Sequence, residues 1–455
     1  MTLAEAVTKV ANYAYILHLT YVLGVLGFGL YTTSLSLTEL FLVLIASGID
    51  IYAIKEISSD KASVGNIVGE ILSVKLVIFA ISFISILAIG FFISNSTEEY
   101  IAICIAGLLL IGRGINGRWV YQGLEKMNIV AARQIITSLL LLSTMLIFVN
   151  NDTDVLLALS ILATMEFLGM AWVFYYYFKE GNRFRLDFST KVLKKTFRAA
   201  WAFGLYFLFV QLYQSVDKLM LWVMVEDYEY QNGILSSSYK VMVLFLSVGI
   251  VIQHVMYPRL SAAENERRKS NFEIFAKLSA IVAGIGYGIM IFFPEITDII
   301  LSDEYKEAKE IAFYHGFLLF TISWVVMLTL PLLAWGKQKS ILIATGIGAL
   351  GNILANYFLI PEYGMYGSAI ASIISEALVL FIALYLFSKE KLNISPLKFL
   401  LYPVFGISVY WSASLWFYSG NNLIFVVVLA TIAYLILLIL TKQINMDLLN
   451  KLKES

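Results

Sequence analysis

The chain carries a long series of apolar stretches, each about as long as a helix that crosses a lipid bilayer. A spanning helix needs roughly 20 mostly apolar residues, and about fourteen such stretches follow one another, separated by short polar or Gly/Pro breaks. Their centres lie near residues 15, 42, 80, 110, 139, 166, 211, 244, 286, 322, 350, 376, 408 and 431. The sequence therefore predicts an all-α polytopic membrane protein with about 14 transmembrane helices.

The composition agrees with a bilayer as the solvent. Hydrophobic residues make up 60% of the chain and charged residues 14%, which is more apolar surface than a water-soluble shell can cover. The first apolar stretch runs directly into the second without a small-residue cleavage site, so we interpret it as the first span and not as a signal peptide. The single cysteine, Cys104, cannot form an internal disulfide and is interpreted as core filler.

Lysine and arginine are distributed unevenly among the predicted loops. If the amino terminus is cytoplasmic, the segment 179–198 is a basic cytoplasmic loop, and the loops on the opposite side contain only Lys306 and Lys309. Further basic residues on the cytoplasmic side are Lys55, Lys61, Arg118, Lys126, Arg267, Arg268, Lys269, Lys337, Lys339, Lys389 and Lys391. By the positive-inside rule, we predict a multi-pass protein of the cytoplasmic membrane with both termini in the cytoplasm.

Three pairs of similar phrases recur at a nearly constant offset. GLYTTSLSLTELF at 29–41 resembles GILSSSYKVMVLF at 233–245, an offset of 204, and the stretches ending at Glu180 and Glu390 superpose at an offset of 210. The third pair is QGLEKMNIV from 122 and WGKQKSILI from 335. Six predicted helices separate the copies, so we predict two six-helix bundles that are parallel repeats related by a pseudo-two-fold axis along the membrane normal.

The repeat divides the chain into four predicted parts. These are an amino-terminal lobe at 1–180, a basic cytoplasmic linker at 181–198, a second lobe at 199–390, and the last two spans with a tail at 391–455. The linker is basic and partly amphipathic, which suits a helix lying on anionic lipid. The alternative for this linker is a solvated tether.

Four stretches carry a family resemblance. Residues 113–127, RGINGRWVYQGLEKM, resemble the signature of polysaccharide and O-antigen flippases of the Wzx type, in the multidrug/oligosaccharidyl-lipid/polysaccharide exporter superfamily, and the stretches beginning at 23, 211 and 331 resemble the same family. The chain departs from the family pattern at Thr20 and Tyr21, where an arginine is often found, and in the loop at 302–304. The resemblance implies an alternating-access carrier that moves a polyprenyl-pyrophosphate-linked oligosaccharide from the inner to the outer leaflet for surface polysaccharide assembly.

Such a cargo combines an anionic pyrophosphate, a hydroxyl-rich glycan and an apolar tail. Ionisable side chains at membrane depth are costly and are therefore candidates for function, and cations suit a pyrophosphate. The candidates for the head group are Arg113, Lys240, Lys75 and Lys218. The alternative is that each side chain reaches the nearer interface, which we favour for Lys75 and Lys218 but not for Arg113 and Lys240.

A polar stripe in the seventh span is the candidate for the glycan. Gln211, Gln214 and Lys218 share one helix face at positions i, i+3 and i+7, and they either meet sugar hydroxyls or form hydrogen bonds between helices.

Coupling to Na⁺ or H⁺ is assigned to three other candidates, Glu39, Asp217 and His18. For Glu39 the alternative is structural pairing with a basic neighbour, and for His18 it is a satisfied buried histidine. Glu166 and Glu376 are symmetry-matched, and we expect them to have a structural role in their bundles.

Several function classes find no support in the sequence. It has no phosphate-binding glycine loop, no Cys/His metal spacing and no GxSxG turn, so we predict no enzyme, cofactor or metal, and no basic domain suggests nucleic acid. The alternatives left open are a cation-coupled multidrug exporter of the same superfamily and a membrane-embedded glycan polymerase or ligase. The expected partners are the lipid-linked glycan, membrane lipid, a coupling cation and a polysaccharide polymerase.

Overall fold

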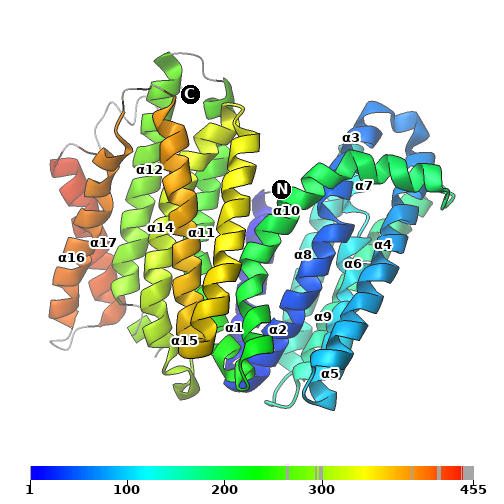
Figure 1. Cartoon of the computed structure of the whole chain (residues 1–455), viewed down its shortest axis with the longest axis horizontal. Coiled ribbons are helices and arrows are strands. Elements are labelled where there is room, and N and C mark those ends of the chain that lie inside the picture. The colour runs from blue at the N-terminus through cyan, green and yellow to red at the C-terminus, as the bar shows by residue number, and fades with distance from the viewer. Residues whose placement is uncertain are drawn as a thin grey trace. The chain divides into compact units, whose positions relative to one another are not determined.

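A computed structural model describes residues 2–262, 266–292, 295–296, 301–390, 392, 394–417, 422–441 and 443 (Figure 1). All regular elements in these ranges are helices. The elements up to α9 are α1 Thr2–Val22, α2 Gly24–Ile45, α3 Ser47–Ser59, η1 Lys61–Ser63, α4 Val64–Ile93, α5 Thr97–Gly107, α6 Leu109–Gly114, α7 Arg118–Gly123, α8 Met127–Phe148 and α9 Val155–Lys179. The later elements are α10 Thr190–Met224, α11 Tyr228–Ala262, α12 Glu266–Ile291, η2 Asp303–Tyr305, α14 Ala308–Ala334, α15 Gln338–Ser388, η3 Pro396–Leu400, α16 Leu401–Phe417 and α17 Leu423–Leu440.

Ten helical segments among the described residues are long and apolar enough to cross a membrane. The predicted class, an all-helical multi-pass membrane protein, is therefore confirmed, whereas the count of fourteen stays a prediction. The set of ten joins α2 and α3 into one segment and does not include α1, α10 or α11.

The 51-residue helix α15 consists of two antiparallel parts. A straight helix of this length would extend about 77 Å, far beyond the roughly 30 Å of a hydrocarbon core. Gly364 interrupts it with non-helical dihedrals (φ 53°, ψ −129°). The two parts are tied together where Ser375 Oγ donates a hydrogen bond to the carbonyl oxygen of Gly348, at 2.8 Å. Their positions match the predicted spans centred near 350 and 376.

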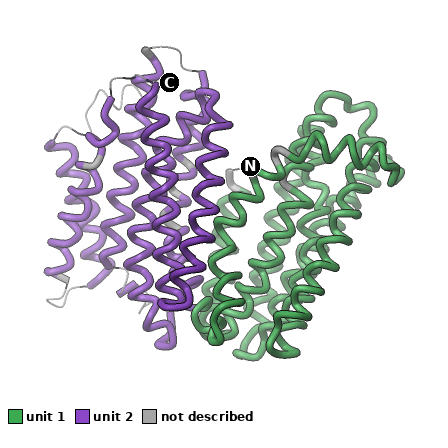
Figure 2. The backbone as a smooth tube through the Cα atoms, in the orientation of Figure 1, with its two compact units in different colours: residues 1–233 green, residues 234–455 purple. Residues whose placement is uncertain are grey.

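The chain divides into two compact units, residues 1–233 and 234–455 (Figure 2). Unit 1 therefore includes α10, which packs against α2, α3 and α4. The aromatic core of unit 2 lies among α12, α14, α16 and α17, with Phe272, Tyr410 and Tyr434 in its interior. The predicted four-part division, with its linker at 181–198, stays a prediction.

Within unit 1, the start of α2 crosses the start of α11 in close backbone contact. A Cβ added at Gly29 would collide with the carbonyl oxygen of Glu229, and a Cβ added at Gly233 would collide with that of Val25. The offset of 204 relates Gly29 to Gly233 and Val25 to Glu229, so the contact is reciprocal. Reciprocal contacts of this kind are what a two-fold relation produces. They support the predicted repeat at this crossing, while its extension over six helices stays a prediction.

Candidate functional site

Four charged side chains from four helices meet inside unit 1, and we call them the Arg113 cluster: Glu39 of α2, Arg113 of α6, Arg133 of α8 and Glu166 of α9. Glu166 accepts from both arginines, with Arg113 Nε at 2.9 Å from Oε1 and Arg133 Nη2 at 2.9 Å from Oε2. Glu39 Oε1 lies 3.7 Å from Arg113 Nη1. Negative and positive side chains alternate through the cluster in the order Glu39, Arg113, Glu166, Arg133, and their formal charges sum to zero.

Exposure increases along this chain of charges. The side chain of Arg133 is 10% exposed and that of Glu166 is 23% exposed, whereas Glu39 at the other end is 43% exposed. Because the 3.7 Å between Glu39 and Arg113 exceeds a direct hydrogen bond, the pair at the open end is the weakest contact. The cluster therefore has a closed end that packs helices and an open end that other groups can reach.

Two glycines let the helices approach closely enough for the cluster to form. A Cβ added at Gly112 would lie 2.6 Å from the carbonyl carbon of Glu166, and a Cβ at Gly169 would lie 2.6 Å from Nε of Arg133. Real Cβ atoms do not approach other atoms this closely, so a larger residue at Gly112 would push α6 away from α9, and one at Gly169 would displace the guanidinium of Arg133. The two ion pairs of Glu166 depend on this spacing.

The structure thus brings together residues to which the sequence assigned different roles. Arg113, expected as a head-group cation, and Glu39, expected as a coupling group, are neighbours, and Glu166, expected to have a structural role, pairs with Arg113. For Glu39 this contact agrees with the alternative of pairing with a basic neighbour. Arg133 was missed, although an arginine two turns inside an apolar span meets the same criterion as Arg113.

Lys75 lies in a second charged pair, in which the lysine is buried between helices and its partner Asp50 is 24% exposed. Its side chain is 0% exposed, and its ammonium contacts Asp50 Oδ1 at 2.5 Å and donates to the carbonyl oxygen of Gly114 at 2.6 Å. The ring of Trp119 lies 5.7 Å from the ammonium. The favoured interpretation that Lys75 reaches an interface is wrong, because partners within the protein compensate the buried charge. Asp50, its carboxylate partner, was not among the predicted residues.

The predicted polar stripe lies on α10, and its members differ in environment. Gln211 Nε2 donates to Ser215 Oγ of the same helix at 2.7 Å, and Gln214 is exposed. Lys218 and Asp217 are partly buried. The hydrogen bond between helices comes from Asn232, which donates to the Lys218 carbonyl oxygen at 3.0 Å and to Thr33 Oγ1 of α2 at 2.8 Å. The stripe is thus a partly exposed face of α10, on which Gln214 is exposed and Gln211 and Lys218 are partly buried.

Three further residues were singled out in the sequence. His18 Nε2 hydrogen-bonds the carbonyl oxygen of Val149 at 2.9 Å, which agrees with the alternative of a satisfied histidine. Lys240 is partly buried in α11 and belongs to unit 2, as does Glu376, whose residue exposure is 8%.

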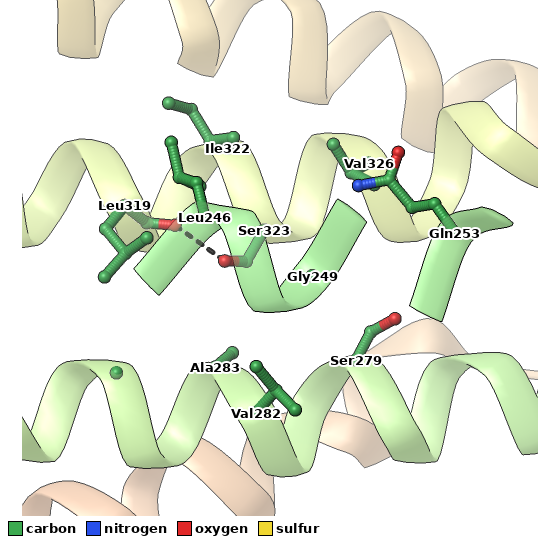
Figure 3. A pocket seen from close by; sticks show the side chains of 11 residues that line it. Leu246, Gly249, Gln253, Ser279, Val282, Ala283, Leu319, Ile322, Ser323 and Val326 are labelled. Atoms are coloured by element: carbon green, nitrogen blue, oxygen red, sulfur yellow. Dashed lines mark hydrogen bonds between the residues drawn. The ribbon is translucent and has the colours of Figure 1, made fainter. Parts of the chain in front are cut away.

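Unit 2 contains a small cavity among α11, α12 and α14 (Figure 3). Its volume is about 50 Å³, and Gln253 and Ser279 contribute polar groups to a mostly apolar lining. Ser323 lines it too, but its hydroxyl donates to the Leu319 carbonyl oxygen at 2.8 Å. Since one water occupies about 30 Å³ of liquid, this cavity is too small for a sugar. Within the described residues, no group of three or more His, Cys, Asp or Glu side chains is arranged to hold a metal ion.

The fold is similar to that of solved membrane transporters. A lipid II flippase MurJ structure in an inward closed conformation superposes with a TM-score of 0.77 at 14% identity, over 95% of this chain and 98% of that chain. An inward-facing multidrug resistance MATE transporter of the MOP superfamily superposes with a TM-score of 0.64 at 13% identity, over 85% and 96% of the two chains.

Sequence comparison supplies a relative and a family. The chain is 27% identical over 324 residues to a putative O-antigen transporter of Shigella dysenteriae. The aligned region covers 70% of this chain and 80% of the relative. The model of the polysaccharide biosynthesis protein family matches residues 1–264, more than half of the chain. These relatives are named as transporters or flippases, so the prediction of a transporter in place of an enzyme is confirmed. The chain belongs to the polysaccharide biosynthesis protein family and has the fold of the MOP superfamily transporters.

Proposed function

We propose that this protein is an alternating-access flippase that moves a polyprenyl-pyrophosphate-linked oligosaccharide from the inner to the outer leaflet of the cytoplasmic membrane. The family match, the relative named as an O-antigen transporter and the fold shared with a lipid II flippase support this class of cargo.

The observation that carries the proposal is the open end of the Arg113 cluster. Glu166 engages Arg113 through Nε at 2.9 Å, whereas Glu39 lies 3.7 Å from Nη1. A guanidinium has five donors in a planar fork that fits phosphate oxygens. The pyrophosphate therefore replaces Glu39 at the Nη edge of Arg113, while Glu166 and Arg133 keep the guanidinium in place. In this way the enclosed end of the cluster positions the cation and the open end binds the cargo.

Displacement of Glu39 by the pyrophosphate couples cargo binding to the binding of a cation. A carboxylate left beside an incoming pyrophosphate is repelled by it, and a proton or a sodium ion on Glu39 removes that repulsion. Cargo binding and cation binding at Glu39 are therefore mutually favourable, which is the requirement for coupled transport. Asp217 and His18 stay candidates for a second coupling group. Since His18 is hydrogen-bonded to the carbonyl oxygen of Val149, Glu39 is the first coupling group.

The other predicted contacts extend the proposal to the remaining parts of the cargo. Gln211, Gln214 and Lys218 on the partly exposed face of α10 suit the glycan hydroxyls, and Lys240 in unit 2 suits the head group at a later stage of transport. Lys75 takes no part in binding while its ammonium is held by Asp50 and Gly114. Both termini lie in the cytoplasm in this proposal, and a polysaccharide polymerase receives the product on the outer side.

The test is the leaflet distribution of lipid-linked glycan in cells that carry Arg113→Ala, Arg113→Lys or Lys240→Ala at matched membrane levels. Glycan should accumulate in the inner leaflet with Arg113→Ala and Lys240→Ala, and partly with Arg113→Lys. Lys61→Ala removes an exposed cation, 48% exposed and paired with Glu125, and should export normally. Full export by both alanine variants would refute the assignment. Normal glycan export together with lost efflux of cationic dyes would favour the multidrug exporter.

A further inference from the structure

A groove of unit 1 lies outside the Arg113 cluster, between the first half of α10 and the helices α2, α3 and α4. Two adjoining cavities form it, with volumes of about 360 Å³ and about 320 Å³, and both are lined by Val74, Ile78 and Phe197. The rest of the wall is mostly apolar and includes Val77, Leu44, Ile49, Trp201, Leu205 and Leu208. In Figure 1 the first turns of α10 run across the other helices of unit 1, and the rest of α10 runs alongside α2.

One end of this groove is cationic. Lys194 and Arg198 line the first cavity and stand at i and i+4, so they are neighbours on one helix face. Neither forms an ion pair with another residue that the structure describes. The adjacent Lys195 is engaged with Glu70 of α4 at 3.3 Å, so the charge of that carboxylate is compensated. The groove therefore combines two available cations with a long apolar wall.

The segment that leads into α10 is tied to α4, which keeps the cationic end in place. A Cβ added at Gly65 or Gly69 of α4 would collide with the carbonyl oxygens of Arg183 and Arg185, and Asp187 N donates to Ser73 Oγ at 2.8 Å. The backbone of this segment is therefore held against α4, although the side chains at 185–191 are exposed. The groove is a preformed feature of unit 1.

We propose that this groove binds an anionic phospholipid, with the phosphate between Lys194 and Arg198 and an acyl chain along the wall that Phe197 and Trp201 line. From residue 194 to residue 208 the helix extends about 21 Å, which exceeds the roughly 15 Å of one hydrocarbon leaflet. Two cations at one end of an apolar groove of that length match a charged head on an apolar chain. The site is separate from the cargo site, and this inference does not depend on the identity of the cargo.

Trp201 lines the groove and reports its occupancy. The full-length protein is reconstituted in nanodiscs of phosphatidylcholine with increasing fractions of brominated phosphatidylglycerol or brominated phosphatidylcholine. The Trp201 signal is the difference between the wild type and Trp201→Phe, since the chain has 8 tryptophans. We expect brominated phosphatidylglycerol to reach half-maximal quenching at a lipid fraction at least about tenfold lower than brominated phosphatidylcholine. The reason is that each surface cation increases the affinity for an anionic lipid about fivefold.

Two double variants and one single variant separate binding in the groove from general effects of charge. Lys194→Gln with Arg198→Gln should reduce the preference to less than twofold, and Val77→Trp, which fills the first cavity, should reduce quenching by both lipids. Lys55→Gln with Arg183→Gln removes two exposed cations outside the groove and should keep the preference. Equal quenching by the two lipids in the wild type would overturn the inference, as would an unchanged preference in the Lys194/Arg198 variant. Displacement of phosphatidylglycerol by a small fraction of undecaprenyl phosphate would show a prenyl lipid as the occupant and would also overturn it.

Discussion

Gly29 of α2 and Glu229 of α11 meet backbone to backbone, and no side chain fits between them. The reciprocal contact between Gly233 and Val25 completes the crossing. The hydrogen bond from Asn232 to Thr33 lies next to it at 2.8 Å. Two glycines at equivalent places in the two similar phrases of the sequence thus allow two helices to cross at minimal distance. This crossing links the first phrase of the repeat to the second.

The crossing predicts a stability effect at Gly29. Gly29→Ala should lower the free energy of unfolding by about 1–3 kcal/mol, because the new methyl group forces the backbone of α11 to move. Gly249→Ala is the matched control, since it lies in a helix where nothing within 4 Å would meet the added methyl group, and it should be neutral or slightly stabilising. The measurement is the thermal denaturation midpoint of each purified variant in the same detergent. Equal midpoints for wild type and Gly29→Ala would contradict the close contact.

The closed end of the Arg113 cluster predicts that substitutions there lower the free energy of unfolding by different amounts. Glu166→Ala leaves the charges of Arg113 and Arg133 without their shared carboxylate and should cost about 3–5 kcal/mol. Arg133→Met should cost less, because Glu166 keeps Arg113 as a partner. Denaturation of the purified variants measures both effects. If Glu166→Ala were as stable as wild type, the pairs of Glu166 would not hold α6, α8 and α9 together.

The Lys75 and Asp50 pair predicts strong coupling between two substitutions. Lys75→Met alone leaves a carboxylate beside an apolar side chain, and Asp50→Leu alone leaves a fully enclosed ammonium. Each single variant should therefore lose about 3–5 kcal/mol, while the double variant should recover most of that loss. A double-mutant cycle on stability measures the coupling. Additive losses would show that the two side chains do not depend on each other.

The same double variant separates the structural role of Lys75 from a role in binding. Transport by Lys75→Met with Asp50→Leu should be near normal if the pair only packs α3 against α4. If the double variant is stable but does not export glycan, Lys75 contributes to transport in another conformation. The leaflet assay of lipid-linked glycan at matched membrane levels gives the answer.

The distribution of basic residues predicts the orientation of every loop. Reporters placed at residues 60 and 188 should report the cytoplasm, and reporters at 97, 152 and 228 should report the outside. Cysteine accessibility in intact cells is a suitable measurement after replacement of the single natural cysteine, Cys104. One reversed site among these five would refute the predicted order of spans in the first half of the chain.

The membrane environment, the helical class and the family could all be predicted from the sequence. Apolar length decides whether a segment can cross a bilayer, and this property is local, so the stretches near 350 and 376 are recognisable even where the structure joins them in α15. The match of phrases at an offset of 204 likewise needs no coordinates, and it marks the two glycines that meet at the crossing of α2 and α11.

The tertiary structure alone decided which charges meet. A helical sequence shows how deep Arg113, Arg133, Glu166 and Lys75 lie, but it does not show which helix faces are opposed, because helix packing depends on contacts between segments far apart in the chain. For Glu166 the sequence predicted a structural role without its partners, and in the structure it binds two arginines from other helices. Lys75 was expected at an interface and is enclosed beside Asp50. The energy of a buried charge depends on its partners, and only the fold specifies them.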